Sequence, residues 1–477
     1  MKQLLKQPWL LSPPTTTSTI GMKQLLKQPW LVSPPTTTYI IRMKRSVVCI
    51  FLLSFSLIVA AQNILRLPDA INIALKNSLE VQLSKNIVDA NTVLNNYGVA
   101  GGLPFVTGSV TDNEQVSNIN QKTNNGDIIR TIQRNNAATN TFALGVTGSI
   151  LLYNGNRVVA TKTRLATLVK QSEKQLNSQI QNILASVMVG YYDIVRQQSY
   201  MKTIEKSIDA SNQQLDIVKA RQSVGLANNA DLFQAQIDLN ALVQAKQSQQ
   251  LIIGQAKIEL LRQLTLNPDS AIAIQDTILV DRAMKLEDVL NSLNKNANIT
   301  AAQDQIEINE LVVKEIAALR YPSVRATTGY SFSRNKAAAG QLLLNQNYGP
   351  SVGVNVGIPI YNGSIFKRQQ KVAQINVRNA ELDKQILVRD LSSQVVKSYQ
   401  SYTATLQQLK TEQQNYTLSN QLLELALERF KYKQATIVDV KNAQQSFEAS
   451  GYRLVNLNYA AKSAEIELKR LANQLSL

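Results

Sequence analysis

The 477-residue sequence contains no histidine and only one cysteine, Cys49. The missing imidazole excludes Ser-His and Cys-His catalysis and every histidine-ligated metal site. A single cysteine forms neither a CxxC redox motif, nor an intrachain disulfide, nor a zinc ribbon. The phosphate-binding patterns GxxxxGK[ST] and GxGxxG are also missing. We therefore predict a protein without catalytic residues, bound metal or cofactor, which favours a scaffold or conduit over an enzyme.

What the sequence has in abundance is neutral amides, with 46 Gln and 42 Asn. Apolar residues make up 44% of the chain, enough to build a core. The net charge is +17, but Lys and Arg are scattered at helical spacing and do not cluster with aromatic residues. This distribution argues against nucleic-acid binding.

The first 61 residues form a separate N-terminal region, which we interpret as a signal peptide and the sequence upstream of it. Residues 1–21 recur almost verbatim as residues 22–42, and Met43 then opens a basic segment, an apolar run to Val59 and small residues ending at Ala61. We predict a signal peptide at 43–61 and regard 1–42 as upstream sequence from a mis-assigned start. A run of roughly thirteen apolar residues is shorter than the about 20 that a spanning helix needs, which disfavours a retained anchor. A genuine doubled extension is the other alternative, but it would bury the signal internally.

From residue 62 onward, the sequence contains an internal repeat with two copies. Tyr153-Asn154-Gly155 matches Tyr361-Asn362-Gly363 at an offset of 208 residues, and Ala220–Gln236 matches Glu428–Gln444 at the same offset. The segments further upstream match at offsets of 218–219, so we expect the halves to differ by about ten residues in one intervening loop. The predicted repeats are 62–285 and 286–477, each running helix, strand, loop, strand, very long helix, turn and long helix.

Long helices are predicted at about 156–222 and 230–265, and again at about 364–430 and 437–474. Proline is missing from Phe105 to Asn267 and from Ile360 to Leu477, and apolar residues recur every three to four positions. A helix of about 65 residues is roughly 100 Å long. Such lengths indicate coiled-coil-like packing.

Strands are predicted at about 104–113, 141–152, 323–333 and 350–360, with polar loops at 113–140 and 334–347. Thr141–Ile150 places Phe, Leu, Val and Ile on one face and small or polar residues on the other, and Ser351–Ile358 alternates more strictly. This alternation is typical of outer-membrane β-barrel strands. A soluble sandwich would show the same alternation.

Four strands do not close a barrel, and an open edge in lipid leaves backbone groups unsatisfied. Three chains would together supply twelve strands and twelve long helices. The number of strands alone does not exclude an assembly of another symmetry. The predicted fold class is an α+β membrane protein. It combines a trimeric 12-stranded outer-membrane β-barrel, with four strands per chain, and a long α-helical barrel built from two internal repeats.

These features resemble the TolC-type outer-membrane efflux protein family over Ile64 to Leu477. The doubled half-repeat, the Tyr-Asn-Gly before each long helix, and Arg429 followed by Ala435–Val440 and Ala443-Gln444 carry the resemblance. It implies a homotrimeric exit duct in outer-membrane lipid, with its helical part in the periplasm. Such a duct serves tripartite efflux or type I secretion, docking on a periplasmic adaptor (membrane fusion) protein and an inner-membrane RND or ABC-type pump. It passes cargo without chemical change.

The resemblance also implies a gate at the periplasmic tip. Asp439 matches a lumen-facing carboxylate of the family, Asn442 stands where many relatives carry a second Asp, and Asp231 is the equivalent in the first half. Three Asp439 carboxylates would form an anionic ring attractive to cations. The alternative is that Asp439 and Asp231 only cap the following helices.

The turns between the long helices are the implied adaptor contacts. They contain Gly225 and Leu226 in the first half and Lys433, Gln434 and Ala435 in the second. Lys433 stands where relatives commonly carry Gly, so it would strain a left-handed turn or signal a different one.

Arg221 and Arg429 are candidates for ionic links at the tip, with a solvated helix end as the alternative. The rival function is an exported, non-conducting coiled-coil stalk or adhesin. A passive general porin does not account for the long helices.

Overall fold

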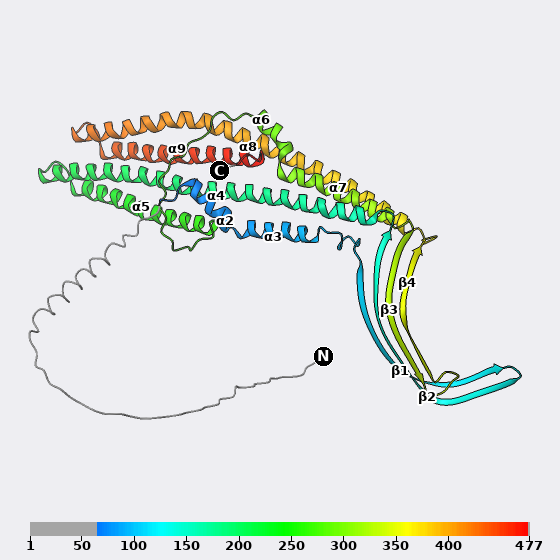
Figure 1. The fold of residues 1–477 in the computed structure, drawn as a ribbon. Helices are drawn as coiled ribbons and strands as arrows, with labels where there is room; N and C mark the ends of the chain where they lie inside the picture. Colours follow the sequence, from blue (N-terminus) through cyan, green and yellow to red (C-terminus); the bar gives the residue numbers. More distant parts are fainter. Residues whose placement is uncertain (1–63, 476–477) are drawn as a thin grey trace, which may run out of the picture. The chain divides into compact units, whose positions relative to one another are not determined.

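The computed structural model describes residues 64–475, which belong to a compact unit from Gln62 to Leu477. The duplicated segment 1–42 and the predicted signal peptide at 43–61 lie outside the described residues. Figure 1 shows long helices in antiparallel pairs and a four-stranded sheet in this unit.

The long helices repeat at a constant offset. In the first half, α4 (Arg157–Ser223) and α5 (Asn229–Gln263) form a hairpin, and in the second half α8 (Ile365–Lys431) and α9 (Ile437–Leu471) do the same. Both α4 and α8 have 67 residues, and both α5 and α9 have 35. Every one of these boundaries is related by the 208-residue offset of the Tyr-Asn-Gly repeat.

Shorter helices precede each strand pair. The first half has α2 (Leu67–Asn77) and α3 (Leu79–Leu94), and the second has α6 (Leu286–Ser292), the 3₁₀ turn η2 (Leu293–Lys295) and α7 (Ala297–Ala318). Ser78 caps α3 by accepting from the Val81 N–H, and Asn296 caps α7 by accepting from the Asn298 N–H. These caps satisfy orphan donors at the helix starts.

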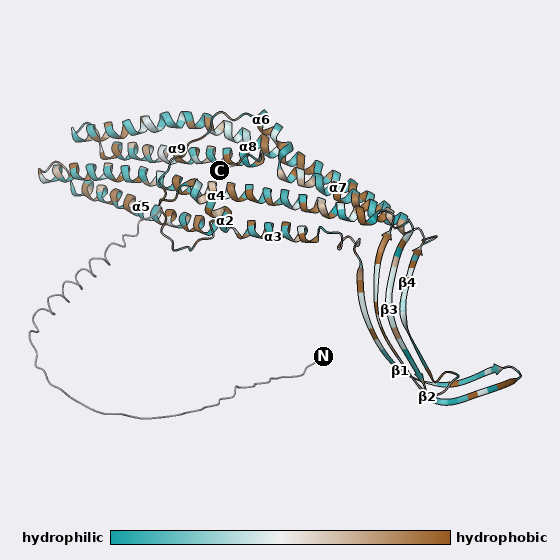
Figure 2. Cartoon of the chain, viewed as in Figure 1, coloured by the Kyte–Doolittle hydropathy of each residue, from teal (hydrophilic) through white to brown (hydrophobic). Residues whose placement is uncertain are grey.

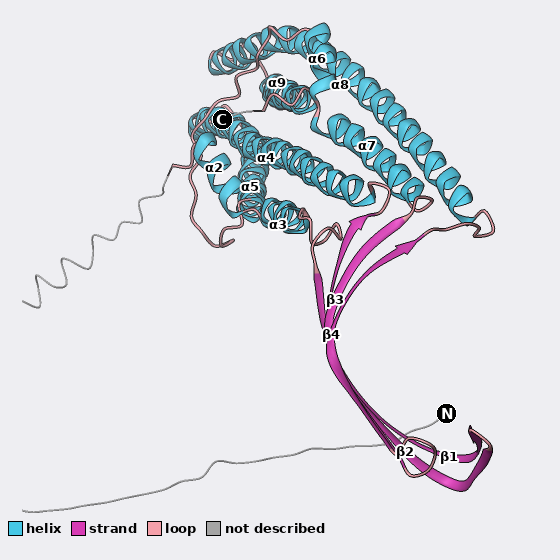
Figure 3. Ribbon diagram, turned by 45° about the vertical axis from the view of Figure 1, so that its right-hand side comes forward, coloured by secondary structure: helices cyan, strands magenta, loops and turns pink. Residues whose placement is uncertain are grey.

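The four strands form one antiparallel sheet in the order β1-β2-β3-β4. They are β1 (Phe105–Asn125), β2 (Ile128–Tyr153), β3 (Ser323–Ala337) and β4 (Leu344–Gly357). Figure 3 shows these strands leaving the helical part together.

The predicted loop at 113–140 is wrong, because β1 and β2 continue through it and pair as far as Asn125 with Ile128. The ten extra residues of the first half therefore lengthen a β-hairpin rather than a loop. The main-chain ladder pairs polar strands as readily as apolar ones, so the Asn-rich composition did not reveal them. Most of the predicted loop at 334–347 is likewise strand.

Three clusters of buried side chains hold the helices together. Ile71, Tyr191 and Leu260 belong to one cluster that joins α2, α4 and α5. Val395 and Leu468 belong to another that joins α8 and α9 to the α6 region, and a third lies toward the hairpin turns. Figure 2 shows apolar and polar residues interspersed along α4 and α8. No described helix contains an apolar stretch long enough to cross a membrane.

Several of the abundant amides connect separate segments of the chain instead of facing water. The buried Gln181 donates to the Leu475 carbonyl at 3.0 Å and accepts from the Leu475 N–H at 3.2 Å. Gln249 of α5 donates to the Gln197 side chain of α4 at 2.8 Å. A buried amide is tolerated because its hydrogen bonds are made.

Candidate functional site

The two hairpin turns have the same backbone conformation. In the first turn, the Leu226 N–H donates to the Arg221 carbonyl at 2.8 Å and the Gly225 N–H donates to the Gln222 carbonyl at 2.9 Å. This pair of bonds is a Schellman motif, which requires a left-handed residue at the position of Gly225. The φ angle of Gly225 is +74°.

Lys433 takes the glycine position of the second turn. Its φ angle is +61°, its N–H donates to the Phe430 carbonyl at 3.1 Å, and the Gln434 N–H donates to the Arg429 carbonyl at 2.8 Å. Of the two expectations for Lys433, the structure therefore has the left-handed turn, retained with a lysine side chain. That conformation brings the lysine Cβ too close to the backbone carbonyl, at a cost of about 1–2 kcal/mol.

Asp439 completes a capping box at the start of α9. The N-cap residue is Thr436, whose side chain accepts from the Asp439 N–H at 3.2 Å, while the Asp439 carboxylate accepts from the Thr436 N–H at 2.8 Å. The Thr436 N–H and the Thr436 hydroxyl both donate to the Asp439 carboxylate, and with the nearby Arg429 they hold the pKa of Asp439 below its usual range. The carboxylate is exposed and ionised at neutral pH. Asp439 thus takes part in capping from the third helical position, and this role is compatible with an exposed charge.

The other two predicted gate residues lie near the beginnings of α9 and α5. Asn442 is exposed one turn after Asp439 on α9. Asp231 is half-buried in the first turn of α5, where Asn228 is the cap and accepts from the Asp231 N–H at 2.8 Å. Asp231 is therefore not itself the N-cap.

Arg221 connects the two hairpins within one chain. Its guanidinium lies 4.3 Å from the centre of the Phe430 ring and donates to the Phe430 carbonyl. Arg429 instead donates to the Gln434 carbonyl of its own turn at 3.3 Å. Of the two arginines, the structure brings only Arg221 across to the other hairpin.

Sequence reasoning missed a second connection between the hairpins. Lys441 of α9 and Asp238 of α5 form an ion pair, with 2.8 Å between Nζ and Oδ1. The two residues are 203 positions apart, and no local pattern signals their pairing. With Arg221, this pair joins the first hairpin to the second close to the turns.

The sheet has two faces of different composition. Two rows of the first face are Val110-Leu144-Phe332-Tyr348 and Val106-Gly148-Thr328-Val352. Two rows of the second face are Ser109-Gly145-Ser331-Gly349 and Thr107-Thr147-Gly329-Ser351. The first face, which we call the apolar face, is uncovered in the single chain, where Val352 is 86% exposed. We call the second the small-residue face.

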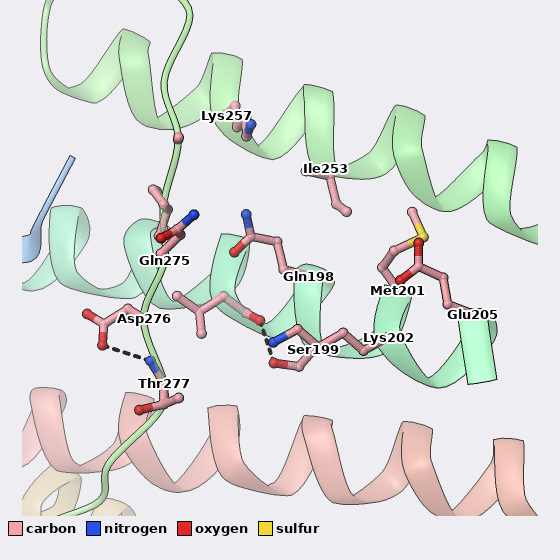
Figure 4. A pocket seen from close by; sticks show the side chains of 13 residues that line it. Gln198, Ser199, Met201, Lys202, Glu205, Ile253, Lys257, Gln275, Asp276 and Thr277 are labelled. Atoms are coloured by element: carbon pink, nitrogen blue, oxygen red, sulfur yellow. Dashed lines mark hydrogen bonds between the residues drawn. The ribbon is translucent and has the colours of Figure 1, made fainter. Parts of the chain in front are cut away.

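A groove of about 850 Å³ lies between α4, α5 and the segment 273–277 (Figure 4). Two polar groups beside it attach that segment. Lys257 donates to the Ile272 carbonyl at 2.9 Å, and the Tyr191 hydroxyl donates to the Asp276 carboxylate at 3.2 Å. Burial beside Asp276 raises the pKa of Tyr191, so this hydroxyl keeps its proton. The groove is interpreted as structural.

Among residues 64–475, no cluster of acidic side chains has the geometry to hold a metal ion. The chemistry available at the hairpin turns is therefore that of an exposed carboxylate, two arginines and backbone groups.

Two outer-membrane proteins of known sequence are similar to this chain. Escherichia coli (strain K12) outer membrane protein TolC is 22% identical over 307 residues, spanning 62% of this chain and 62% of that protein. Outer membrane efflux protein BepC of Brucella suis biovar 1 (strain 1330) is 21% identical over 346 residues, spanning 71% of this chain and 74% of BepC.

Solved structures show the same fold. The outer membrane protein VceC from Vibrio cholerae matches with a TM-score of 0.70 at 18% identity, covering 85% of this chain and 96% of that one. The Campylobacter jejuni CmeC outer membrane channel matches with a TM-score of 0.70 at 16% identity, covering 86% and 85%. Channels of the TolC family are trimers.

The sequence pattern of the outer membrane efflux protein family matches twice, at residues 70–264 and 290–474, once for each half of the internal repeat. The chain therefore belongs to the outer membrane efflux protein family and has the TolC-like fold.

Proposed function

We propose that three copies of this chain form the outer-membrane exit duct of a tripartite efflux or type I secretion system. The observation that carries the proposal is the four-stranded sheet with one uncovered apolar face. An apolar band on the outside and small polar residues inside are what a lipid-embedded, water-filled barrel requires. Twelve pooled strands would close the barrel and remove the open edges.

The long hairpins would continue the barrel as a helical tunnel. Both α4 and α8 begin within a dozen residues of a strand end, so the wall of the barrel leads directly into them. At 67 residues, each helix would extend roughly 100 Å into the periplasm. The hairpin turns would then lie at the periplasmic tip.

We assign the gate to the tip residues Asp439, Asn442 and Asp231. Asp439 keeps its charge, because its capping partners favour the ionised carboxylate. Three copies would attract cations in the narrow end of a tunnel. Asn442 contributes no charge, so the ring carries one carboxylate per chain at this level.

The turns containing Gly225, Leu226, Lys433, Gln434 and Ala435 are the proposed contacts for a periplasmic adaptor protein. All of these residues except Ala435 are exposed. Arg221 supports the contact indirectly, because it holds the two turns of one chain together. The adaptor would connect the duct to an inner-membrane pump of the RND or ABC type.

Ion conductance across planar lipid bilayers tests the duct and the gate separately. The wild-type protein is expected to form channels that divalent cations block by binding at the Asp439 ring. Asp439→Asn removes the charge but keeps an oxygen for the Thr436 N–H, so loss of divalent block would report the charge alone. Asp390 is an exposed carboxylate of α8 outside the gate residues, so Asp390→Asn is the control and should keep the block.

Two results would contradict the proposal. Unchanged block in Asp439→Asn would leave Asp439 with its capping role only. Release of the protein from envelopes by carbonate wash, with a monomeric native mass, would instead favour the non-conducting stalk.

A further inference from the structure

The charged residues of the sheet are divided unequally between its two faces. The acidic residues Asp112 and Glu114 lie on the apolar face at its outer end, where the Asn140 side chain donates to both carboxylates. The small-residue face carries no carboxylate in any row from Phe105–Ser149 to Asn125–Ile128. Its charged residues are three arginines: Arg325, Arg134 and Arg130.

Arg325 occupies the end of the small-residue face that adjoins the helices. It pairs with Leu151 on β2 and Asn355 on β4, and its guanidinium donates to the Ser149 hydroxyl at 3.4 Å. Arg325 is exposed, and within the described part of the chain it forms no ion pair. A fixed positive charge therefore faces the space on this side of the sheet.

Arg157 lies beside Arg325 in one cavity. The cavity has a volume of about 520 Å³ and is lined by both arginines, together with Asn154 and Ser323. Arg157 is the first residue of α4, and that helix has no acidic residue in its first turn. The positive end of the helix dipole adds to the two guanidinium charges. Ser323 belongs to the same face of the sheet as Arg325, which places the opening of the cavity on the small-residue side.

The outer hairpin adds two more charges on the same face. Arg134 pairs with Ile119 and Arg130 with Thr123, and both partners follow the alternation of Thr107 and Ser109 along β1. Neither arginine has a carboxylate partner among the described residues. The small-residue face is therefore positive at both of its ends.

We propose that the barrel lumen binds anions, with Arg325 and Arg157 forming the anion site in each chain where barrel and helices meet. This inference rests on the proposed function, because three copies of the small-residue face must line one lumen. Rings of Arg or Lys side chains select anions in pores, and planar guanidinium groups bind phosphate oxygens in pairs. The ligands that this site favours are small anions that carry phosphate or similar oxyanion groups.

The test is block of single channels by sodium tripolyphosphate added to the barrel side of a planar bilayer. Full-length wild-type protein is expected to be blocked. Arg325→Gln and Arg157→Gln should each raise the half-blocking concentration about tenfold, because each removes a charge-assisted contact to phosphate. Arg325→Lys keeps the charge and should stay nearer to wild type than Arg325→Gln.

Arg334→Gln is the matched control, since Arg334 lies on the same strand but on the apolar face. It should leave the half-blocking concentration unchanged. The zero-current potential in a KCl gradient gives an independent readout, which should shift toward potassium in Arg325→Gln and not in Arg334→Gln.

The outcomes separate the two proposals. Wild-type channels that conduct but bind tripolyphosphate no better than Arg325→Gln and Arg157→Gln would overturn the anion site alone. An equal shift in Arg334→Gln would also overturn it, because the effect would not depend on the face. A wild-type protein that never conducts would overturn the exit duct, and the anion site with it.

Discussion

Gly451 marks a close approach between the two hairpins, and adding one methyl group there should destabilise the fold. Gly451 is buried in α9. A Cβ atom at this position would lie 2.6 Å from Cγ2 and 3.0 Å from Oγ1 of Thr203 on α4, and 3.3 Å from Cε2 of Tyr416 on α8. Contacts this short require a helix or a side chain to move.

The magnitude follows from comparison with a glycine in open surroundings. Overpacking a well-packed core costs about 1–3 kcal/mol. Gly254 lies inside α5, and a Cβ added there would have no neighbouring atom within 4 Å, so alanine should gain about 0.5–1 kcal/mol from helix propensity. Gly451→Ala and Gly254→Ala are thus expected to change stability in opposite directions.

Thermal unfolding in detergent, followed by circular dichroism at 222 nm, measures both variants at one scan rate. An unfolding entropy of about 2.1 cal/mol/K per residue makes 1 kcal/mol equivalent to about 1 °C for a chain of this size. Gly451→Ala should therefore unfold about 1–3 °C below wild type. Gly254→Ala should unfold slightly above wild type.

A second substitution tests the cause. Thr203→Ala removes both atoms of Thr203 that the new methyl group would meet, so it should recover part of the loss in Gly451→Ala. If Gly451→Ala unfolds together with Gly254→Ala, or if Thr203→Ala recovers nothing, the close approach of α4 and α9 is not what limits this position.

Three further predictions concern the tip and the helix core. Lys433→Gly should stabilise the second turn by about 1 kcal/mol, and Gly225→Ala should destabilise the first by a similar amount, as amide hydrogen exchange at each turn would report. Because the folded pKa of Asp439 is lowered, its capping contribution is complete above the unfolded pKa of about 3.9. That contribution is lost as pH falls through the folded pKa, so the protection factors of amides in the first turn of α9, which correct for the intrinsic pH dependence of exchange, should fall on acidification in wild type but not in Asp439→Asn. The buried Glu465 accepts from Lys462 at 3.0 Å and from Lys469 at 2.8 Å, so Glu465→Gln should cost about 3 kcal/mol in the thermal scan, against about 0–1 for the exposed Asp390→Asn.

The long helices were predictable because their signals are local. The offset of 208 residues is visible in the sequence and locates all four helices, whose observed boundaries differ from those predicted by at most three residues. The two faces of the sheet were equally readable, since side chains alternate with a period of two. The hairpin extension of β1 and β2 was not predictable from the sequence. Its strands pair through main-chain hydrogen bonds, and its side chains are polar.

At the hairpin turns, residue types suggested candidate positions but not how their side chains are arranged. Asp439 and Arg221 were both candidates from the sequence, and their roles stay predictions. That Asp439 reaches back to Thr436, and that Arg221 lies on Phe430 of the other hairpin, depends on the backbone conformation of turns and on helices packed side by side.

By itself, the sequence determined the internal repeat, the long helices, the alternating strands and the absence of histidine, because each of these is recorded in composition or in spacing along the chain. Only the tertiary structure decided that Lys441 contacts Asp238, that Gly451 lies against Thr203, and that Arg157 and Arg325 line one cavity. The physical reason is that such contacts depend on how two hairpins and a sheet pack in space. For residues more than 160 positions apart, no local sequence pattern signals that they lie close together.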